Sequence, residues 1–406
     1  MNTGLSFATL SKYPPYRSGH AQQALWNNRA LARITGRIQH QVTYCGTPRD
    51  PGDDAGADVV VHHVPQSARN GRAVDGHLIK AMAAEVVRVC LDHNVDAVLT
   101  YYADPHAEAA NRAVRVLSEF GRHPVLLHSL EGSDVLDSIC EHVEDRQAAL
   151  LITDVVDADV LCAVSHYTAD CFVRAVDDIF GAQAAEATAS RVHIRYPGLP
   201  DSAFAAPAAE INDRDLVSLG IDPRRPVVSS IGRLAPEKGH DVVADVAEHA
   251  YAEGSPVQFV IAGGGEIGRE LDRRQARLPN LFVRRDVDPA RLHSLRAASA
   301  AGLLPTRAVP GFTETFCISA LEYAAVGVPV LATRLGGVPE AVPGEDFLIE
   351  PTASSCEWWA RLTRVLERRA HLGEAARVFA RGFTDEVSAS RILDLTTAAL
   401  ALRASA

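Results

Sequence analysis

Two cations in the second half of the chain have the types and spacing to bind an anion. Arg233 and Lys238 lie in SSIGRLAPEKGHDVV (229–243), where a strand is expected to end and a helix to begin near His240. A helix N-terminus offers free backbone amides and the positive end of the helix dipole, so two cations beside it favour an anion site. The alternative is a solvated charged loop. Lys238 argues against it, because the chain has only three lysines among 40 basic residues, and lysine supplies a compact charge that the planar arginine does not.

Two acids follow further along the chain. Glu314 precedes a helix expected to begin near Phe316, and Glu322 lies eight positions later inside the otherwise apolar FCISALEYAAVG. A buried carboxylate is costly unless it is paired or hydrogen-bonded. Sugar hydroxyls are suitable partners, because an ionised carboxylate accepts several hydrogen bonds. The alternative for Glu322 is a pair with an arginine.

Backbone groups around the same helix add to this picture. The amides of Phe316, Cys317 and Ile318 precede the first helical hydrogen bonds and could hold an anion. The strand VPVLAT then runs into Gly336-Gly337, which allows close backbone approach or forms an ordinary turn.

A glycine-rich loop raises a different possibility. QFVIAGGGEIGRELDRR (258–274) satisfies G-x-G-x-x-G from Gly263 to Gly268, and Asp286 lies about where a ribose-binding acid would follow. An NAD-dependent oxidoreductase is therefore an alternative function. A dinucleotide site places its glycines at the first strand–helix turn of a domain. Here the first turn is the charged GRLAPEKG and the glycines follow the second strand, which disfavours that alternative.

The elements that would position these residues alternate between strand and helix in both halves. Apolar runs such as DAVLTYY and VQFVIAG alternate with amphipathic stretches such as HLIKAMAAEVVRVCLDH, which favours parallel sheets covered on both faces. Segment 197–215, rich in Pro, Ala and Asp, is predicted to link two domains. We therefore expect an α/β protein with two doubly wound Rossmann-like domains facing across a cleft, at 1–203 and 204–383. A terminal helix at 384–406 could return to the first domain.

Composition sets outer limits on function. The 406 residues are 47% hydrophobic and 22% charged, which is typical of a globular protein with room for two domains. The formal net charge of -11 argues against a nucleic-acid partner. No apolar run reaches the length of a membrane span, so we expect a cytoplasmic protein with no integral membrane segment. The seven cysteines form no C-x-x-C pair; we expect reduced thiols, no metal and no cofactor.

The motifs together resemble a known family. GRLAPEKG, VIAGGGE, and Glu314 with Glu322 in an E-x7-E frame are similar to the donor-binding half of the retaining glycosyltransferases of family 4. That family has the two-domain GT-B architecture. The match is strong from about 226 to 345 and extends into the first half through YPPYRSGH and VLLHSLEGSDV.

The resemblance implies a role for each matching residue of the second half. Arg233 and Lys238 would bind the donor diphosphate and neutralise the leaving group. Glu314 would hold a hydroxyl of the transferred sugar, and Glu322 would bind the nucleotide ribose. The backbone of four residues would contact phosphate, sugar or nucleotide: Gly264, Phe316, Cys317 and Ile318.

In the first half, Gly19 would form a loop under the diphosphate, and His128 and Glu131 would face the sugar and the acceptor. Two positions depart from the family pattern. Ser18-Gly19 stands where the family commonly has Gly-Gly, and Cys317 stands where it commonly has glycine. A side chain at either position would narrow the room for close backbone approach.

The implied reaction is retaining transfer of a sugar, with GlcNAc and glucose as first candidates, from a nucleotide diphosphate sugar to a small acceptor. UDP is the first candidate for the nucleotide. Scarce lysine indicates a GC-rich bacterial genome, which suits antibiotic or other secondary-metabolite biosynthesis. An aminocyclitol or aminoglycoside acceptor could meet Glu131, Asp134 and Asp104. An inositol phosphate or a lipid-linked glycan are the alternative acceptors, and the oligomeric state is open.

Other classes of protein share parts of this pattern. A nucleotide-sugar epimerase has the same architecture and would consume donor with no acceptor present. A glycogen-phosphorylase-like enzyme would need a cofactor-bearing lysine, for which only Lys12 and Lys80 remain. A non-catalytic sugar-binding protein would bind the donor without releasing nucleoside diphosphate.

Overall fold

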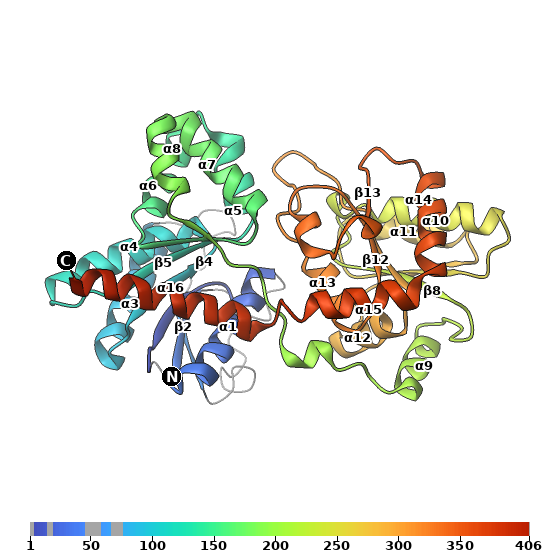
Figure 1. Ribbon diagram of the computed structural model, residues 1–406, viewed down its shortest axis with the longest axis horizontal. Coiled ribbons are helices and arrows are strands. Elements are labelled where there is room, and N and C mark those ends of the chain that lie inside the picture. The colour runs from blue at the N-terminus through green and yellow to red at the C-terminus, as the bar shows by residue number, and fades with distance from the viewer. Residues whose placement is uncertain (1–3, 14–18, 45–57, 66–75, 406) are drawn as a thin grey trace. The chain divides into compact units, whose positions relative to one another are not determined.

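The computed structural model describes residues 4–13, 19–44, 58–65 and 76–405. The chain divides into two compact units, each with its own parallel sheet (Figure 1). Unit 1 comprises Met1–Gly198 with Thr384–Ala406, and unit 2 comprises Leu199–Phe383. The division after Gly198 lies a few residues before the boundary expected at 203/204.

Unit 1 is built on a seven-stranded sheet in the order β3-β2-β1-β4-β5-β6-β7. All its strand pairs are parallel. In chain order the strands are β1 (Phe7–Leu10), β2 (Gln39–Thr43), β3 (Val59–His63), β4 (Ala97–Tyr101), β5 (Val125–Leu130), β6 (Val160–Ala163) and β7 (Val192–Ile194). The order reverses direction between β1 and β4, the place where ligands bind in open α/β sheets.

Helices cover both faces of this sheet, because alternate strand residues point to opposite sides. Phe7, Ala97 and Val125 belong to a core with α1 and α16, whereas Ala8, Val98 and Leu126 belong to a core with α3, α4, α6 and α7. The helices are α1 (Gly19–Thr35), α3 (Gly76–His93), α4 (Ala103–Glu119), α5 (Ser133–Leu136), α6 (Arg146–Val156), α7 (His166–Phe180), α8 (Ala182–Ala189) and α16 (Asp385–Ser405), with a 3-10 turn η1 (Cys140–His142).

Strand β2 was not expected from the sequence, because Gln39, His40 and Gln41 give it no apolar pattern. All three side chains are nonetheless buried. The Gln39 side-chain carbonyl accepts a hydrogen bond from the Phe7 backbone N–H (2.8 Å), and the Gln41 amide donates to the Ser11 hydroxyl (2.8 Å). Buried polar groups are tolerated where they are satisfied in this way, so tertiary hydrogen bonds rather than hydrophobicity retain this strand.

Unit 2 is built on a six-stranded sheet in the order β10-β9-β8-β11-β12-β13, again with parallel pairs throughout. The strands are β8 (Val227–Ile231), β9 (Gln258–Ala262), β10 (Leu281–Arg284), β11 (Ala301–Leu304), β12 (Val330–Thr333) and β13 (Leu348–Ile349). All six coincide with apolar runs in the sequence. The prediction of two doubly wound Rossmann-like α/β domains is thus confirmed.

The helices of unit 2 fall into two groups, and the helices within each group pack against one another. In one group α10 packs against α11 and α14; in the other, α12 packs against α9 and α13, and α13 against α15. Right-handed crossovers from β8 outward in each direction along the sheet place the two groups on opposite faces. The helices are α9 (Ala209–Ser218), α10 (His240–Ala252), α11 (Gly268–Gln275), α12 (Pro289–Ala298), α13 (Ile318–Ala325), α14 (Ser355–Glu367) and α15 (Arg369–Ala380), with 3-10 turns η2 (Asp201–Phe204), η3 (Pro236–Lys238), η4 (Val338–Ala341) and η5 (Glu345–Phe347).

The predicted linker at 197–215 is partly wrong, since its second half begins helix α9, which packs on α12. The chain passes from unit 1 to unit 2 between Gly198 and Leu199. The Gln23 side chain exchanges two hydrogen bonds of 2.9 Å with the Gly198 backbone and fixes the chain there.

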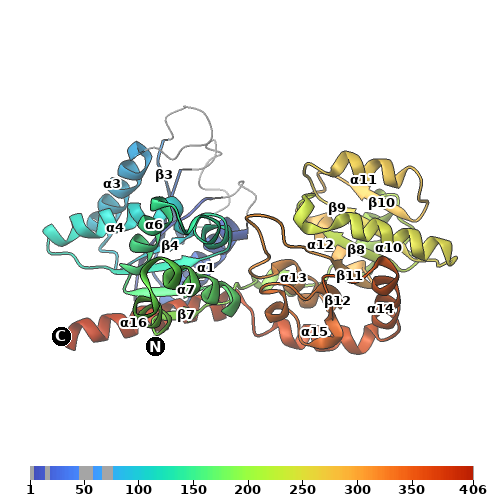
Figure 2. The ribbon, with the colours of Figure 1, turned by 90° about the horizontal axis from the view of Figure 1, so that it is seen from above.

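The C-terminal helix α16 belongs to unit 1, where it packs along α1 (red in Figure 2). Arg33 on α1 forms an ion pair of 3.0 Å with the buried Asp385 at the start of α16. The hydrophobic face of α16 that meets the sheet includes Ile392 and Leu393. The terminal helix therefore completes one face of the first sheet.

Two further features concern the hydrophobicity of the helices and the state of the cysteines. Among the described residues, no helix combines the length and the apolar character needed to cross a bilayer. The six described cysteines are free thiols (Cys90, Cys140, Cys162, Cys171, Cys317 and Cys356).

Candidate active site

The loop after β8 is held in place by a buried histidine. The hydroxyl of Ser230 lies 3.1 Å from Nδ1 of His240, and Nε2 lies 3.1 Å from the carbonyl oxygen of Arg233. Burial lowers the pKa of His240 to about 4, so the ring is neutral near pH 7. Because the carbonyl can only accept, Nε2 carries the proton and Nδ1 accepts from Ser230. His240 thereby fixes the backbone that carries Arg233, a role the sequence did not reveal.

The two cations of this loop have different partners. Arg233 pairs with Glu237 of the same loop, and 60% of its side chain is exposed. Lys238 pairs with Glu314, which comes from a distant part of the chain, and the two side chains are only 25% and 13% exposed. Its ammonium group also lies 5.1 Å from the centre of the Phe312 ring.

The Lys238–Glu314 pair keeps a half-buried lysine charged. Burial opposes the charge of Lys238, but the carboxylate of Glu314 outweighs that effect, so the pKa of Lys238 is raised. Both residues line one pocket with Gly232, Cys317 and Ser319. The structure therefore brings together the predicted diphosphate-binding lysine and the predicted sugar-binding acid.

The double glycine after β12 positions Glu314. The backbone N–H of Gly337 donates to the carbonyl of Glu314 at 2.9 Å. Gly336 has φ +53°, and a Cβ there would lie 2.3 Å from the same carbonyl oxygen. Only glycine fits this approach, so Gly336-Gly337 is a point of close backbone contact rather than an ordinary turn.

The start of α13 lies directly after Glu314. Cys317 precedes the helix with φ −88°, a backbone conformation open to any residue, so glycine is not required there. Its thiol is buried, and burial raises its pKa to about 12. Of the three amides expected to hold an anion, that of Ile318 donates to the carbonyl of Phe316 at 3.1 Å, while the Phe316 ring packs 6.0 Å from Phe383.

Glu322 meets an arginine that the sequence did not single out. Nη2 of Arg296, on α12, lies 2.7 Å from Oε2 of Glu322. The alternative of an arginine pair is therefore realised. No motif marks Arg296 in RLHSLRAASA, so only the packing of α12 against α13 identifies it.

The glycine-rich loop packs against the first strand–helix turn of unit 2. A Cβ on Gly263 would lie 1.8 Å from the carbonyl oxygen of Gly232, and one on Gly265 would lie 2.3 Å from that of Leu234. The carbonyl of Gly264 accepts a hydrogen bond from the Leu234 N–H at 2.8 Å. Backbone contact with this turn therefore explains the glycines without a dinucleotide, and it brings Gly264 beside the loop of Arg233.

In unit 1, His128 is inside the sheet rather than at its surface. Its side chain is fully buried on β5; Nδ1 lies 2.8 Å from the Thr100 hydroxyl and Nε2 lies 3.4 Å from the Asn111 side-chain oxygen. Burial lowers its pKa to about 3. His128 was predicted to face sugar and acceptor, whereas in this structure its ring is enclosed by the core of unit 1.

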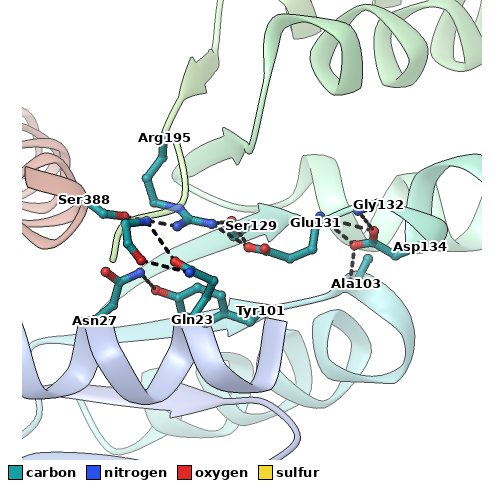
Figure 3. A network of polar contacts seen from close by, with 11 residues as sticks. Gln23, Asn27, Tyr101, Ala103, Ser129, Glu131, Gly132, Asp134, Arg195 and Ser388 are labelled. Atoms are coloured by element: carbon teal, nitrogen blue, oxygen red, sulfur yellow. Dashed lines mark hydrogen bonds and ion pairs between the residues drawn. The ribbon is translucent and has the colours of Figure 1, made fainter. Parts of the chain in front are cut away.

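Glu131, just beyond the end of β5, is part of a buried network (Figure 3). Its carboxylate pairs with Nη2 of Arg195 at 2.5 Å, and the same nitrogen donates to the Ser129 hydroxyl at 2.9 Å. Nη1 of Arg195 lies 3.2 Å from the Ser388 hydroxyl on α16. Burial raises the pKa of Glu131 against the opposing effect of Arg195.

Asp134, the second acid proposed for an acceptor amine, is also engaged. Its carboxylate is fully buried and accepts backbone N–H groups of Ala103, Glu131 and Gly132 at 2.9, 3.1 and 2.7 Å (Figure 3). The third acid, Asp104, is exposed. Glu131 and Asp134 therefore hold the turn after β5 together.

Gly19 is the exposed first residue of α1. Its neighbour Ser18 in the predicted loop lies outside the described residues. Within the described ranges, no group of three or more His, Cys, Asp or Glu side chains is arranged to hold a metal ion.

Residues 225–368 match the family model described as Glycosyl transferases group 1. This segment contains every predicted donor-site residue of unit 2. The two sheets give the GT-B type of fold, and unit 2 contains a segment similar to the glycosyl transferases of group 1.

Curated relatives bear glycosyltransferase names. D-inositol 3-phosphate glycosyltransferase of Corynebacterium jeikeium is 31% identical over 222 residues, which cover 51% of this chain and 52% of that protein. The protein of the same name from Corynebacterium efficiens is 28% identical over 85% of this chain and 90% of its own. A GDP-mannose-dependent alpha-(1-6)-phosphatidylinositol monomannoside mannosyltransferase of Mycolicibacterium smegmatis is 33% identical over 46% of this chain and 47% of its own. The chain spans about half the length of most of the curated relatives it matches.

Solved structures agree in fold. Anabaena HepE in complex with UDP has a TM-score of 0.70 at 17% identity, with coverage of 97% of this chain and 99% of that one. The catalytic domain of starch synthase IV from Arabidopsis thaliana, bound to ADP and acarbose, has a TM-score of 0.75 at 15% identity, with coverage of 98% and 99%.

Proposed function

We propose that this protein is a retaining glycosyltransferase that moves a sugar from a nucleotide diphosphate sugar to a small hydroxyl-bearing acceptor. The observation that carries the proposal is the Lys238–Glu314 pair in a pocket at the carboxyl end of β8. A lysine held charged beside a helix start is suited to a diphosphate leaving group. A carboxylate next to it is suited to a sugar hydroxyl.

Charge stabilisation is the main chemistry that these residues offer. Departure of the nucleoside diphosphate builds negative charge on its phosphate oxygens, and Arg233 and Lys238 would neutralise it. Arg233 is exposed and can exchange Glu237 for phosphate with little cost, because exposed ion pairs are weak. Retention of anomeric configuration follows from the family resemblance, in which the acceptor attacks the face that the leaving group vacates.

For the donor we propose UDP-glucose or UDP-GlcNAc, with GDP-sugars as the alternative that the mannosyltransferase relative suggests. For the acceptor we favour a phosphorylated cyclitol over an aminocyclitol. Glu131 and Asp134 are already committed to Arg195 and to backbone amides, so they do not offer a free pair of charges to ammonium groups. The names of the inositol phosphate glycosyltransferase relatives point the same way.

The test is a donor screen followed by acceptor trials. Purified protein is scanned by thermal shift with UDP-, GDP- and dTDP-sugars, and the donor that stabilises it is incubated with inositol 3-phosphate, inositol or 2-deoxystreptamine. We expect free nucleoside diphosphate and a glycosylated product only when an acceptor is present, with the inositol phosphate as the faster acceptor.

Other results would point to the other classes. Conversion of the donor to its epimer without acceptor would identify an epimerase, and donor binding without diphosphate release would identify a sugar-binding protein. Stabilisation by NAD with no response to any nucleotide sugar would overturn the proposal.

A further inference from the structure

Arg296 holds Glu322 by one oxygen. The ion pair of 2.7 Å joins Nη2 of Arg296 to Oε2 of Glu322, and the two side chains are 11% and 26% exposed. Within the described residues Oε1 of Glu322 has no hydrogen-bond or ion-pair partner. A carboxylate oxygen can accept two hydrogen bonds, so Oε1 remains able to accept from a ligand hydroxyl.

Arg296 is itself fixed by a rigid support. Its guanidinium carbon lies 5.9 Å from the centre of the Tyr323 ring, which is completely buried. The Tyr323 hydroxyl lies 2.7 Å from the Ser229 hydroxyl on β8, which in turn lies 2.7 Å from the hydroxyl of Ser299. Three elements, β8, α12 and α13, thus immobilise the arginine that contacts Glu322.

Glu322 lies about one turn after a pocket-lining residue of its helix. Ser319, which lines the pocket with Lys238 and Glu314, is three positions before Glu322 on α13, and residues three apart share a helix face. Nε of Arg296 is buried without a hydrogen-bond partner. The guanidinium is therefore bound to the rest of unit 2 mainly through its contacts with Glu322 and the Tyr323 ring.

We propose that Arg296 is a positioning residue for ribose recognition: it fixes the Glu322 carboxylate so that Oε1 accepts a ribose hydroxyl of the donor nucleotide. This inference rests on the proposed function. The ion pair with Arg296 restrains the Glu322 carboxylate, so that this carboxylate need not be ordered when the nucleotide binds. A hydrogen bond to a charged acceptor is stronger than a neutral one, so loss of this arrangement should weaken discrimination by ribose hydroxyls.

The experiment measures sugar discrimination rather than activity. Affinities of the full chain for UDP and GDP are compared by calorimetry with those for their 2′-deoxy and 3′-deoxy counterparts. We expect the wild type to prefer a ribonucleotide by about tenfold or more over at least one deoxy form, as for a hydrogen bond to a charged group. In R296Q this preference should fall to about threefold or less, with E322Q showing the same loss.

A control variant on α12 tests whether the effect depends on the position of Arg296 or only on the loss of a positive charge from this helix. Arg291 pairs with Asp288 and has a side chain that is 51% exposed, so R291Q removes the same charge from α12 and should keep the full preference. Because loss of a buried guanidinium can unfold unit 2, R296K serves as the second variant. It retains the charge without the planar fork and should show an intermediate preference.

The outcomes distinguish two failures. If the wild type binds no nucleoside diphosphate, the proposed function fails and this inference with it. If the wild type discriminates and both folded Arg296 variants keep the full preference, Arg296 only packs α12 against α13 and the inference alone is overturned. Equal weakening of ribo- and deoxynucleotides in R296Q would overturn it as well.

Discussion

The ammonium group of Lys238 contacts the carboxylate of Glu314, although 76 positions separate the two residues in the chain. Lys238 follows β8 and Glu314 follows β11, and these strands are neighbours in the sheet. Parallel strands carry their carboxyl ends to the same edge, so the loops that follow them meet. One cation and one acid are thereby placed in one pocket, where the proposed donor sugar would engage both.

Lys238→Ala should lower the rate of sugar transfer by roughly 10²–10³, the loss seen when one electrostatic donor is removed from a transition state. Glu314→Ala should also lower this rate, because the carboxylate that would accept from a sugar hydroxyl is lost. Initial rates of diphosphate release at saturating donor and acceptor provide the measurement. Lys238→Arg should rescue little, because the broad guanidinium does not replace the compact ammonium group.

Lys80 provides the matched control for that prediction. It is exposed on α3 in unit 1, and Lys80→Ala should leave the transfer rate unchanged. Rates near wild type in Lys238→Ala, in protein whose melting temperature is unaltered, would refute the assignment of Lys238 to the leaving group.

Gly265→Ala should destabilise unit 2, whereas Gly264→Ala should not. Gly265 has φ +153°, and its added methyl would lie 2.3 Å from the carbonyl oxygen of Leu234. A methyl on Gly264 would meet only Asp286 Oδ1, at 3.6 Å, which is an ordinary contact. Melting curves of the two variants test the steric explanation of the motif, and equal melting temperatures would show that the loop adapts.

Arg195→Met should cost about 3–5 kcal/mol of unfolding free energy, because it leaves the carboxylate of Glu131 buried without its partner. The double variant R195M/E131L should recover much of that loss, since a buried ion pair can be replaced by apolar side chains of similar volume at little cost. Urea unfolding of each variant, followed by fluorescence or circular dichroism, gives the free energies of unfolding to be compared. If R195M alone is as stable as the wild type, the network of Figure 3 does not support the turn after β5.

The matched control for Arg195 is Arg115, whose pair with Asp157 is largely exposed, with side chains 69% and 49% accessible. Arg115→Met should change stability by less than about 1 kcal/mol. A comparable loss in both variants would mean that burial is not the deciding factor.

Stability should fall as the pH drops from about 6.5 toward 4. Burial lowers the pKa of His128 to about 3 and those of His106 and His40 to about 4. A histidine in the unfolded chain has a pKa near 6.5, so in this pH range the unfolded state binds more protons than the native state. Falling pH therefore favours the unfolded state. Each such histidine contributes a slope of up to about 1.4 kcal/mol per pH unit.

The slope of unfolding free energy against pH, measured by urea titration between pH 7 and pH 5, checks this expectation. His128→Gln should reduce the slope by up to about 1.4 kcal/mol per pH unit, the contribution of one bound proton, whatever its effect on the free energy of unfolding at pH 7. A slope that is identical in His128→Gln and the wild type would contradict the assignment.

Much of the fold could be predicted from the local pattern of apolar residues in the sequence. The strands of unit 2 are apolar runs, and a parallel strand buried on both faces needs such a run, so local pattern marks all six of them. Strand β2 was missed because Gln39 and Gln41 are buried through hydrogen bonds to Phe7 and Ser11, which no periodicity reveals. Helix α9 was missed because it begins inside segment 197–215, whose content of Pro, Ala and Asp resembles a linker.

The candidate site divides in the same way. Residue types and spacing by themselves predicted the class of fold, the charged loop of Arg233 and Lys238, and the candidate acids Glu314 and Glu322, because strand–turn–helix signals and costly buried charges are local properties. The tertiary structure alone decided which charges pair: Lys238 with Glu314, Glu322 with Arg296, and Glu131 with Arg195. It also placed His128 inside the sheet. Pairing and burial depend on residues that the fold brings together from distant positions, and a single sequence carries no record of those distances.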